Sequence, residues 1–197
     1  MPRLTRSDCG EGTQRQLILP HVQAGVKLSN IRTILITHLH PDRTCVCVLI
    51  PDILGLTPLI FSMMGLSSAP GKDDRPRLEL VGPLGLRAFL RTTLSITYAT
   101  LNSCFVVHEL LWPSQPAYPH HPSGSFIYTE EDIYLPPDVR GQTRTLPCMP
   151  PHANELPGRD IRMDESTGTW PRILQLGNVW ISAAPITHRC PTVGYLA

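Results

Sequence analysis

The feature that most constrains the fold is the alternation, over the first 110 residues, of apolar β-branched segments with segments of helical length. Five segments of the chain predict strands: 31–37 (IRTILIT), 77–82 (RLELVG), 104–111 (CFVVHELL), 172–176 (RILQL) and 179–188 (VWISAAPITH). The first of them is apolar enough for burial on both faces. Three segments predict helices: 14–22 behind a Thr13/Gln16 capping box, 52–66 broken or kinked near Pro58, and 83–94 with Pro83 in its first turn. This alternation indicates the α/β class.

Prolines gather in residues 112–171, and the chain holds 21 of them. Such a segment predicts mostly exposed loop, with short strands at best. A length of 197 residues allows one sizeable core, so we predict a single domain over 1–197.

The charge and cysteine content exclude several classes of function. A net charge of +1 gives no general electrostatic attraction to nucleic acid or membrane, and no apolar run is long enough to span a bilayer. The first residues have no apolar core, so they do not form a secretory signal. None of the six cysteines forms a C-x-x-C pair, which favours reduced thiols in an intracellular protein. Cys45 and Cys47 lie beside histidines, but their apolar neighbours favour a core segment over a ligand role.

The segment ITHLHPDR, residues 36–43, carries the clearest chemical signal. In an extended chain His38 and His40 point to the same side, whereas Leu39 points the other way into packing. The pair follows a buried strand, the usual place for active groups in open α/β sheets. Two imidazoles and the nearby carboxylate of Asp42 suit zinc. The alternative is that the spacing arose by chance in a chain with eight histidines.

Other polar residues favour structural readings. His108 lies in an apolar strand and is interpreted as a hydrogen-bonded core histidine. Arg87 and Arg91, four residues apart, could touch phosphate, but a solvated helix face is the favoured interpretation. Three histidines in proline-rich loops are predicted to be solvated: His120, His121 and His152.

Four segments appear in the order found in one enzyme family: DCGEGTQRQL, ITHLHPD, GPLGLRAFL and APITHRCPTVGYLA. With them the chain resembles the ribonucleases Z, zinc phosphodiesterases of the metallo-β-lactamase fold that trim the 3′ ends of precursor transfer RNA. The resemblance implies an αββα sandwich, represented here mostly by its first half. It also implies zinc as cofactor, precursor tRNA as partner, and work in the cytosol, nucleus or mitochondrion.

The family's residues can be carried over by position. His38, His40 and His188 match three histidines of one zinc site, and without the resemblance His188 would be a strand-end histidine. Asp42 matches the aspartate that binds the second zinc and orients or deprotonates the attacking water. Asp8 matches a structural aspartate beneath the metal loops.

Three departures from the family pattern bear on activity. Arg43 stands where the family has histidine, and arginine cannot ligate a metal. Residues 43–54 separate Asp42 from Gly55-Leu56, and we interpret them as an inserted stretch. Only seven residues precede Asp8 and the sequence stops at Ala197, so the family's opening strands and its later ligands lie outside it.

These departures support one zinc ion where the family holds two, and they predict cleavage of precursor tRNA far below the family norm, or none. Two alternatives remain open: a non-catalytic remnant that at most binds zinc, and another hydrolase of the same fold acting on a thioester or lactam. A sheet without its partner sheet would expose an apolar face, which predicts aggregation or association of copies, for example as a homodimer.

Overall fold

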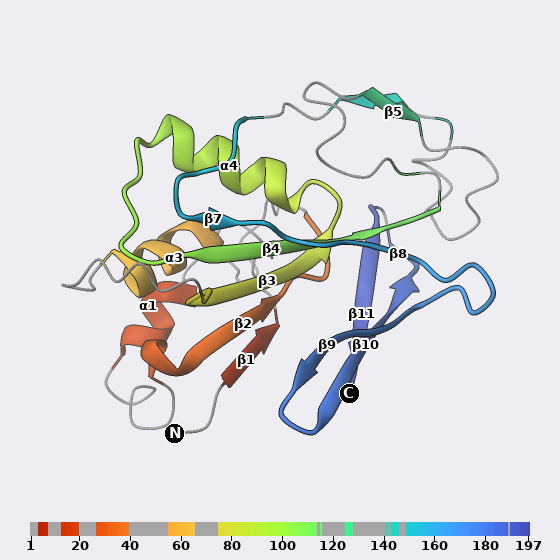
Figure 1. Ribbon diagram of the computed structural model, residues 1–197, viewed down its shortest axis with the longest axis horizontal. Helices are drawn as coiled ribbons and strands as arrows, with labels where there is room; N and C mark the ends of the chain where they lie inside the picture. Colours follow the sequence, from red (N-terminus) through yellow and green to blue (C-terminus); the bar gives the residue numbers. More distant parts are fainter. Residues whose placement is uncertain are drawn as a thin grey trace, which may run out of the picture.

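The structure is a computed structural model that describes residues 4–7, 13–19, 27–39, 55–65, 75–113, 115, 125–127, 141, 143–145, 149–188 and 190–197. Within these residues the larger of the sheets has six strands, and every pairing in it is parallel. Its strands are β1 (Leu4–Ser7), β2 (Ile31–Leu35), β3 (Leu78–Pro83), β4 (Phe105–Leu111), β7 (Glu155–Leu156) and β8 (Asp160–Arg162). The order is β1-β2-β3-β4-β7, and β8 also pairs with β4 (Figure 1).

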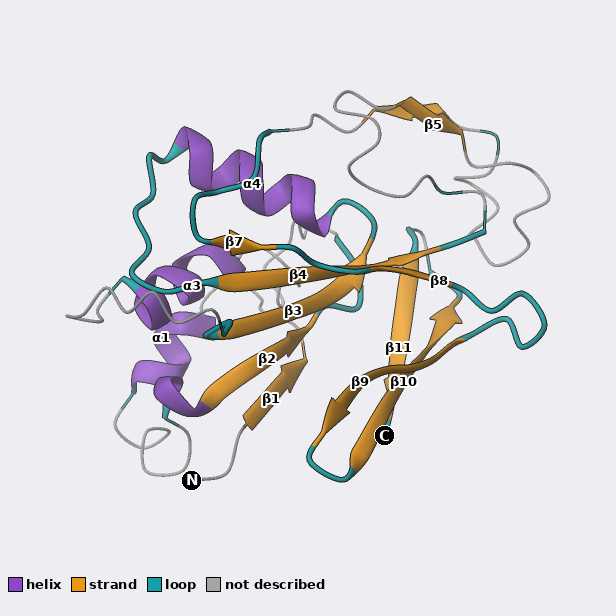
Figure 2. Ribbon diagram, in the orientation of Figure 1, coloured by secondary structure: helices purple, strands orange, loops and turns teal. Residues whose placement is uncertain are grey.

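Helices cover one face of this sheet. They are α1 (Thr13–Ile18), α3 (Leu56–Met64) and α4 (Leu86–Ile96), with a 3-10 turn η1 (Leu28–Asn30) before β2 (Figure 2). Alternate residues of the buried strands point to opposite faces. Ile34 and Leu80 therefore pack against the helices, whereas their neighbours Leu35 and Val81 pack on the other side.

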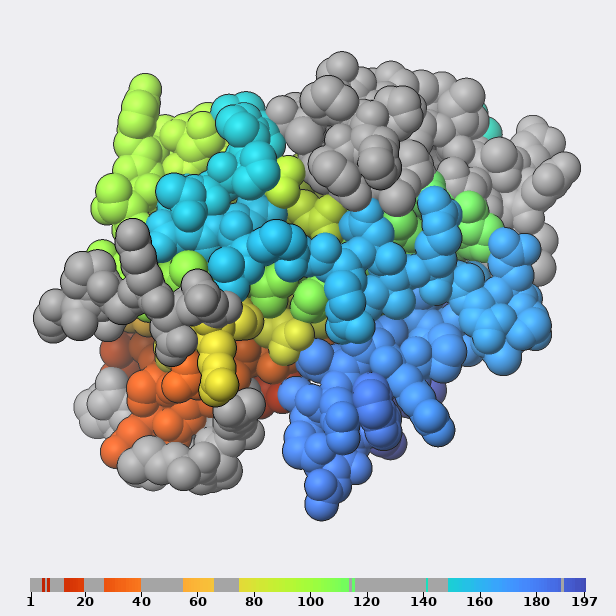
Figure 3. Space-filling model, viewed as in Figure 1, coloured from red at the N-terminus to blue at the C-terminus, as the bar shows by residue number. Residues whose placement is uncertain are grey.

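A second sheet covers the opposite face. It is antiparallel and contains β9 (Trp170–Leu176), β10 (Val179–Ile186) and β11 (Thr192–Leu196), in the order β11-β10-β9. Gly177, at a φ of +62°, makes the turn between β9 and β10. The two tryptophans Trp112 and Trp170 meet edge to face in the core between the sheets, with ring centroids 4.9 Å apart. Figure 3 shows this sheet (blue) as a lobe beneath the strip of residues near 160.

The second sheet corrects the expectation of a bare apolar face. Leu35, Val81 and Leu110 are all buried, the most exposed being Leu35 at 5%. They are buried because β9, β10 and β11, all from the last 30 residues, supply the packing partner. An exposed sheet face therefore no longer gives a reason to expect association between copies. A homodimer stays a prediction.

Strand predictions held better than helix predictions. All five predicted strands are present, although β10 ends at Ile186 and leaves His188 outside it. The helix predicted from residue 14 ends at Ile18, and Pro58 lies in the first turn of α3 without breaking it. Pro83 is the last residue of β3 rather than part of a helix. The helix α4 instead follows Gly85, whose φ of 106° glycine adopts readily.

The proline-rich segment contains short strands, which the sequence allowed without placing them. Besides β7 and β8, it holds a small antiparallel pair, β5 (Ser125–Ile127) with β6 (Thr143–Thr145). Across the described residues, no helix combines the length and apolar character that crossing a bilayer requires.

Candidate metal centre

His38 lies just beyond the carboxyl end of β2, at the edge of the parallel sheet where the strands end. The chain stays extended there, because Ile36 N donates to Val81 O of β3 at 2.8 Å. Leu39 packs against the cluster between sheet and helices, as the alternation predicted. Thr37 Oγ1 lies 2.8 Å from His38 Nδ1, and this hydrogen bond orients the imidazole ring.

His188 and Cys190 come from the connection between β10 and β11. Two residues of β11 hold the strand after that connection against the ends of β2 and β3. Val193 N donates to Thr37 O at 2.9 Å, and Tyr195 Oη lies 2.7 Å from Ile36 O and 3.1 Å from Val81 O. The second sheet is thus fixed by backbone acceptors of the first sheet, beside the histidine.

The two histidines converge from segments 150 residues apart (188 − 38). Their ring centroids are 4.9 Å apart and their planes meet at 79°. One potential ligand atom from each of His38, His188 and Cys190 lies within 4.8 Å of the others, and all three side chains are within reach of solvent. A small ion could be held by all three after modest side-chain adjustment.

Of the residues predicted for the site, the structure brings His38 and His188 together. His40, Asp42, Arg43 and Asp8 lie outside the described residues, as do Cys45 and Cys47, so the metal ligands stay predictions. The sequence reasoning missed Cys190. Its signal was the spacing H-x-C at 188–190, the same as the H-x-H spacing at 38–40.

Replacing Tyr195 with phenylalanine tests the hydrogen bonds that join β11 to the parallel sheet. The change removes the hydroxyl that bonds Ile36 O and Val81 O. We expect the free energy of unfolding to fall by about 1 kcal/mol, because Ile36 O then loses this donor. Urea unfolding followed by circular dichroism should show a lower midpoint with an unchanged slope. An unchanged midpoint would mean that the hydrogen bonds of the Tyr195 hydroxyl do not contribute to stability.

The turn between β3 and α4 is closed by a buried carboxylate. Glu109 is 0% exposed, and its Oε1 accepts hydrogen bonds from Gly85 N and Arg87 N, both at 2.9 Å. Its Oε2 lies 3.6 Å from Arg87 Nη1, an ion-pair distance rather than a hydrogen bond. Burial raises the pKa of the Glu109 carboxyl, while Arg87 and the two backbone N–H groups oppose that rise. The backbone N–H groups of Gly85 and Arg87 are therefore already hydrogen-bonded within the protein.

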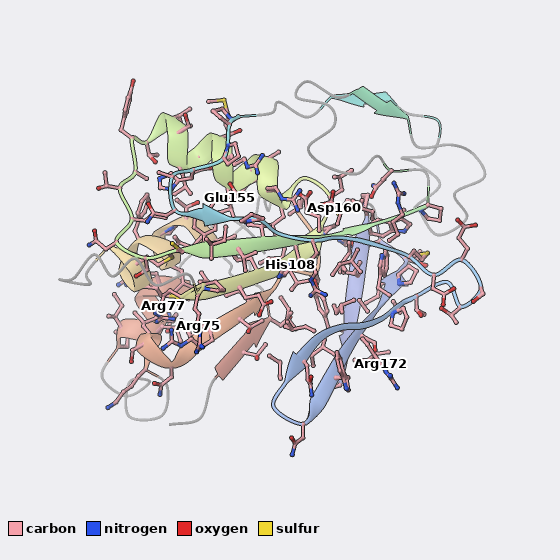
Figure 4. All side chains as sticks on the ribbon, in the orientation of Figure 1. Arg75, Arg77, His108, Glu155, Asp160 and Arg172 are labelled. Carbon is pink, nitrogen blue, oxygen red and sulfur yellow. The ribbon has the colours of Figure 1, made fainter. Side chains whose placement is uncertain are left out.

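Arg87 and Arg91 neither face solvent nor offer a phosphate contact, so the solvated-face interpretation is wrong. They are only 4% and 7% exposed. Arg87 Nη2 donates to Asp160 Oδ1 at 2.9 Å, and Arg91 makes two 2.8 Å hydrogen bonds to Glu155. The two carboxylates lie beneath α4 in Figure 4. Both arginines tie the helix to β7 and β8, because their acidic partners there are partly buried and pair with them.

His108 confirms its structural interpretation. It is 6% exposed, its Nδ1 accepts from Arg159 N at 2.9 Å, and its Nε2 lies 3.0 Å from Glu79 Oε1. His152 was predicted to be solvated, which is wrong. Its Nε2 lies 3.1 Å from Ala99 O, and its Nδ1 accepts from Asn154 N at 3.1 Å. His120 and His121 lie outside the described residues.

Comparisons with known proteins identify a family and several relatives. A family model described as the metallo-beta-lactamase superfamily matches residues 8–135. The chain is 34% identical over 139 residues to zinc phosphodiesterase ELAC protein 1 of Mus musculus, covering 71% of this chain and 33% of that protein. It is 32% identical over 188 residues to the Bos taurus protein of the same name, covering 95% of this chain and 42% of that one.

Two further comparisons point the same way. The chain is 37% identical over 95 residues to ribonuclease Z of Prochlorococcus marinus, covering 48% of this chain and 24% of that one. The crystal structure of human tRNase Z, short form, superposes with a TM-score of 0.57 at 25% identity, covering 96% of this chain and 50% of that chain. The chain thus spans between a quarter and a half of the length of these relatives.

Proposed function

Because the chain belongs to the metallo-beta-lactamase superfamily, we propose that it is a zinc-dependent endoribonuclease that hydrolyses a phosphodiester at the 3′ end of precursor tRNA. The relatives named zinc phosphodiesterase and ribonuclease Z support this reaction class. The observation that carries the proposal is that the ring centroids of His38 and His188 lie only 4.9 Å apart. Two imidazoles drawn together from distant segments at the ends of strands suit a metal centre.

The donor set fits zinc. Zinc takes imidazole nitrogen, thiolate sulfur and carboxylate oxygen in tetrahedral sites, with bonds of about 2.0–2.3 Å. Ligand atoms within 4.8 Å of one another need only a modest side-chain adjustment to reach one ion at such distances. His38 and His188 would hold the ion, and His40 and Asp42 remain the sequence-based candidates for further positions. When bound, zinc supplies a Lewis acid for phosphoryl oxygen and lowers the pKa of water.

The chain's own residues then have separate roles. Thr37 holds the ring of His38 in orientation through its hydroxyl. Asp42 orients or deprotonates the attacking water, as the family position implies. Arg43 offers no lone pair and adds positive charge beside these groups. We therefore propose one zinc ion per chain and weak cleavage, because the two-metal clamp on the attacking and leaving oxygens is incomplete.

The test combines metal content with cleavage of a precursor tRNA that carries a 3′ trailer. We expect about one zinc per purified chain and slow release of the trailer, with both lost in the double variant His38→Ala/His188→Ala. His152→Gln is the matched control, since that histidine bonds Ala99 O and lies outside the cluster. Zinc that persists in the double variant would contradict the site.

The same preparations separate the alternative functions. Zinc without any cleavage would favour the non-catalytic zinc-binding chain. Hydrolysis of a thioester but not of a phosphodiester would favour another hydrolase of this fold. Adding Arg43→His to the wild-type chain should raise zinc content and cleavage if the missing ligand limits activity.

A further inference from the structure

Cys190 is the third member of the group of possible metal ligands, with His38 and His188, and the one that no histidine pattern predicts. Its thiol is not engaged in a disulfide, and one ligand atom from each of Cys190, His38 and His188 lies within 4.8 Å of the other two. Sulfur from cysteine is one of the donors that zinc binds most readily, at about 2.3 Å. The thiol thus lies where a ligand to the proposed ion would have to lie.

The backbone around Cys190 is held in place. Thr192 is 7% exposed, and its hydroxyl donates to Cys190 O at 2.9 Å while lying 3.7 Å from Cys190 Sγ. The next residue, Val193, bonds Thr37 O, beside His38. One short segment therefore fixes the sulfur relative to both imidazoles. Such outer hydrogen bonds commonly orient metal ligands.

We propose that Cys190 binds the metal as a thiolate and, with His38 and His188, forms a two-histidine, one-cysteine centre. This inference rests on the metal site of the proposed function and specifies its chemistry. A thiolate would bring one negative charge to this centre of two neutral imidazoles. Soft sulfur also favours zinc, cobalt or cadmium over magnesium or manganese. These three protein ligands leave the fourth tetrahedral position to His40 or to water.

The experiment uses the full chain, stripped of metal and titrated with Co²⁺ as a spectroscopic substitute for zinc. We expect a sulfur-to-cobalt charge-transfer absorption in the ultraviolet that disappears in Cys190→Ser. The matched control is Cys104→Ser, which removes the other described thiol, also partly buried, and should keep the absorption. Competition with a chelator should show zinc affinity at least about 10-fold weaker in Cys190→Ser than in Cys104→Ser.

A second variant separates ligand loss from misfolding. Cys190→His offers a nitrogen in place of sulfur, so it should recover zinc affinity without the charge-transfer absorption. Persistence of the absorption in Cys190→Ser would overturn the proposal by assigning the sulfur to another cysteine. Wild-type Co²⁺ uptake without the absorption would overturn the role of Cys190 and leave the histidine site standing. No uptake of Co²⁺ or zinc by the wild-type chain would overturn both.

Discussion

Glu109→Ala should lower the free energy of unfolding by about 3–5 kcal/mol, because it removes one of the two carboxylates that pair with the buried Arg87 and the acceptor of two backbone N–H groups. Arg87 would keep Asp160 but lose the charge 3.6 Å away. The first turn of α4 would also lose the acceptor for Gly85 N and Arg87 N. Urea unfolding monitored by circular dichroism measures the change. A loss below about 1 kcal/mol would show that the buried network does not hold the helix.

Glu109→Gln is the matched control, because its amide oxygen can still accept from both backbone N–H groups. Burial raises the folded-state pKa of Glu109 above the ordinary 4.5, so the carboxyl stabilises the fold most below 4.5. That contribution is lost as the pH rises through the folded-state pKa. The stability of wild type relative to Glu109→Gln should therefore be greatest in acid and decline upward from pH 4.5. A difference that grows with pH would contradict the sign.

Trp170→Ala should cost about 3–5 kcal/mol, the usual range for removing a fully buried tryptophan. Trp170 is 0% exposed, meets Trp112 edge to face, and donates from Nε1 to Leu111 O at 3.1 Å. These contacts join the start of β9 to the end of β4. We therefore expect amide hydrogens of β10 to exchange faster in the variant, measured by mass spectrometry.

Trp180→Ala is the control for tryptophan removal as such. Trp180 lies on β10, is 45% exposed and contacts Arg172, whose guanidinium carbon is 5.9 Å from its ring centroid. An exposed contact of this kind contributes about 0.5–1 kcal/mol. Equal losses in the two variants would mean that Trp170 does not anchor the second sheet.

Local patterns predicted the central strands because continuous β-branched runs such as residues 31–37 suit burial on both faces. They did not predict β7 and β8, which are short and lie among prolines. Those strands depend on pairing with β4 and on ion pairs to Arg91 and Arg87, which join residues 64 and 73 positions apart. No pattern within one segment encodes such partners.

The site was predictable in part for the same reason. Alternation in an extended chain predicted that Leu39 and His38 face opposite ways, and Leu39 confirms its side. The meeting of His38 with His188 depends on how the second sheet docks, which only the family resemblance indicated. Cysteine spacing gave no signal for Cys190, because its neighbours in the cluster are histidines from two distant segments. The intracellular location and precursor tRNA as partner stay predictions.

The docking of the second sheet has a consequence for synthesis on the ribosome. Leu35, Val81 and Leu110 can form their strands once about 111 residues have emerged, but Val193 and the rest of β11, which help to cover them, are synthesised later. At about 5–20 residues per second, that delay lasts several seconds. During this interval the nascent chain exposes the hydrophobic face of its parallel sheet, the kind of surface that chaperones bind.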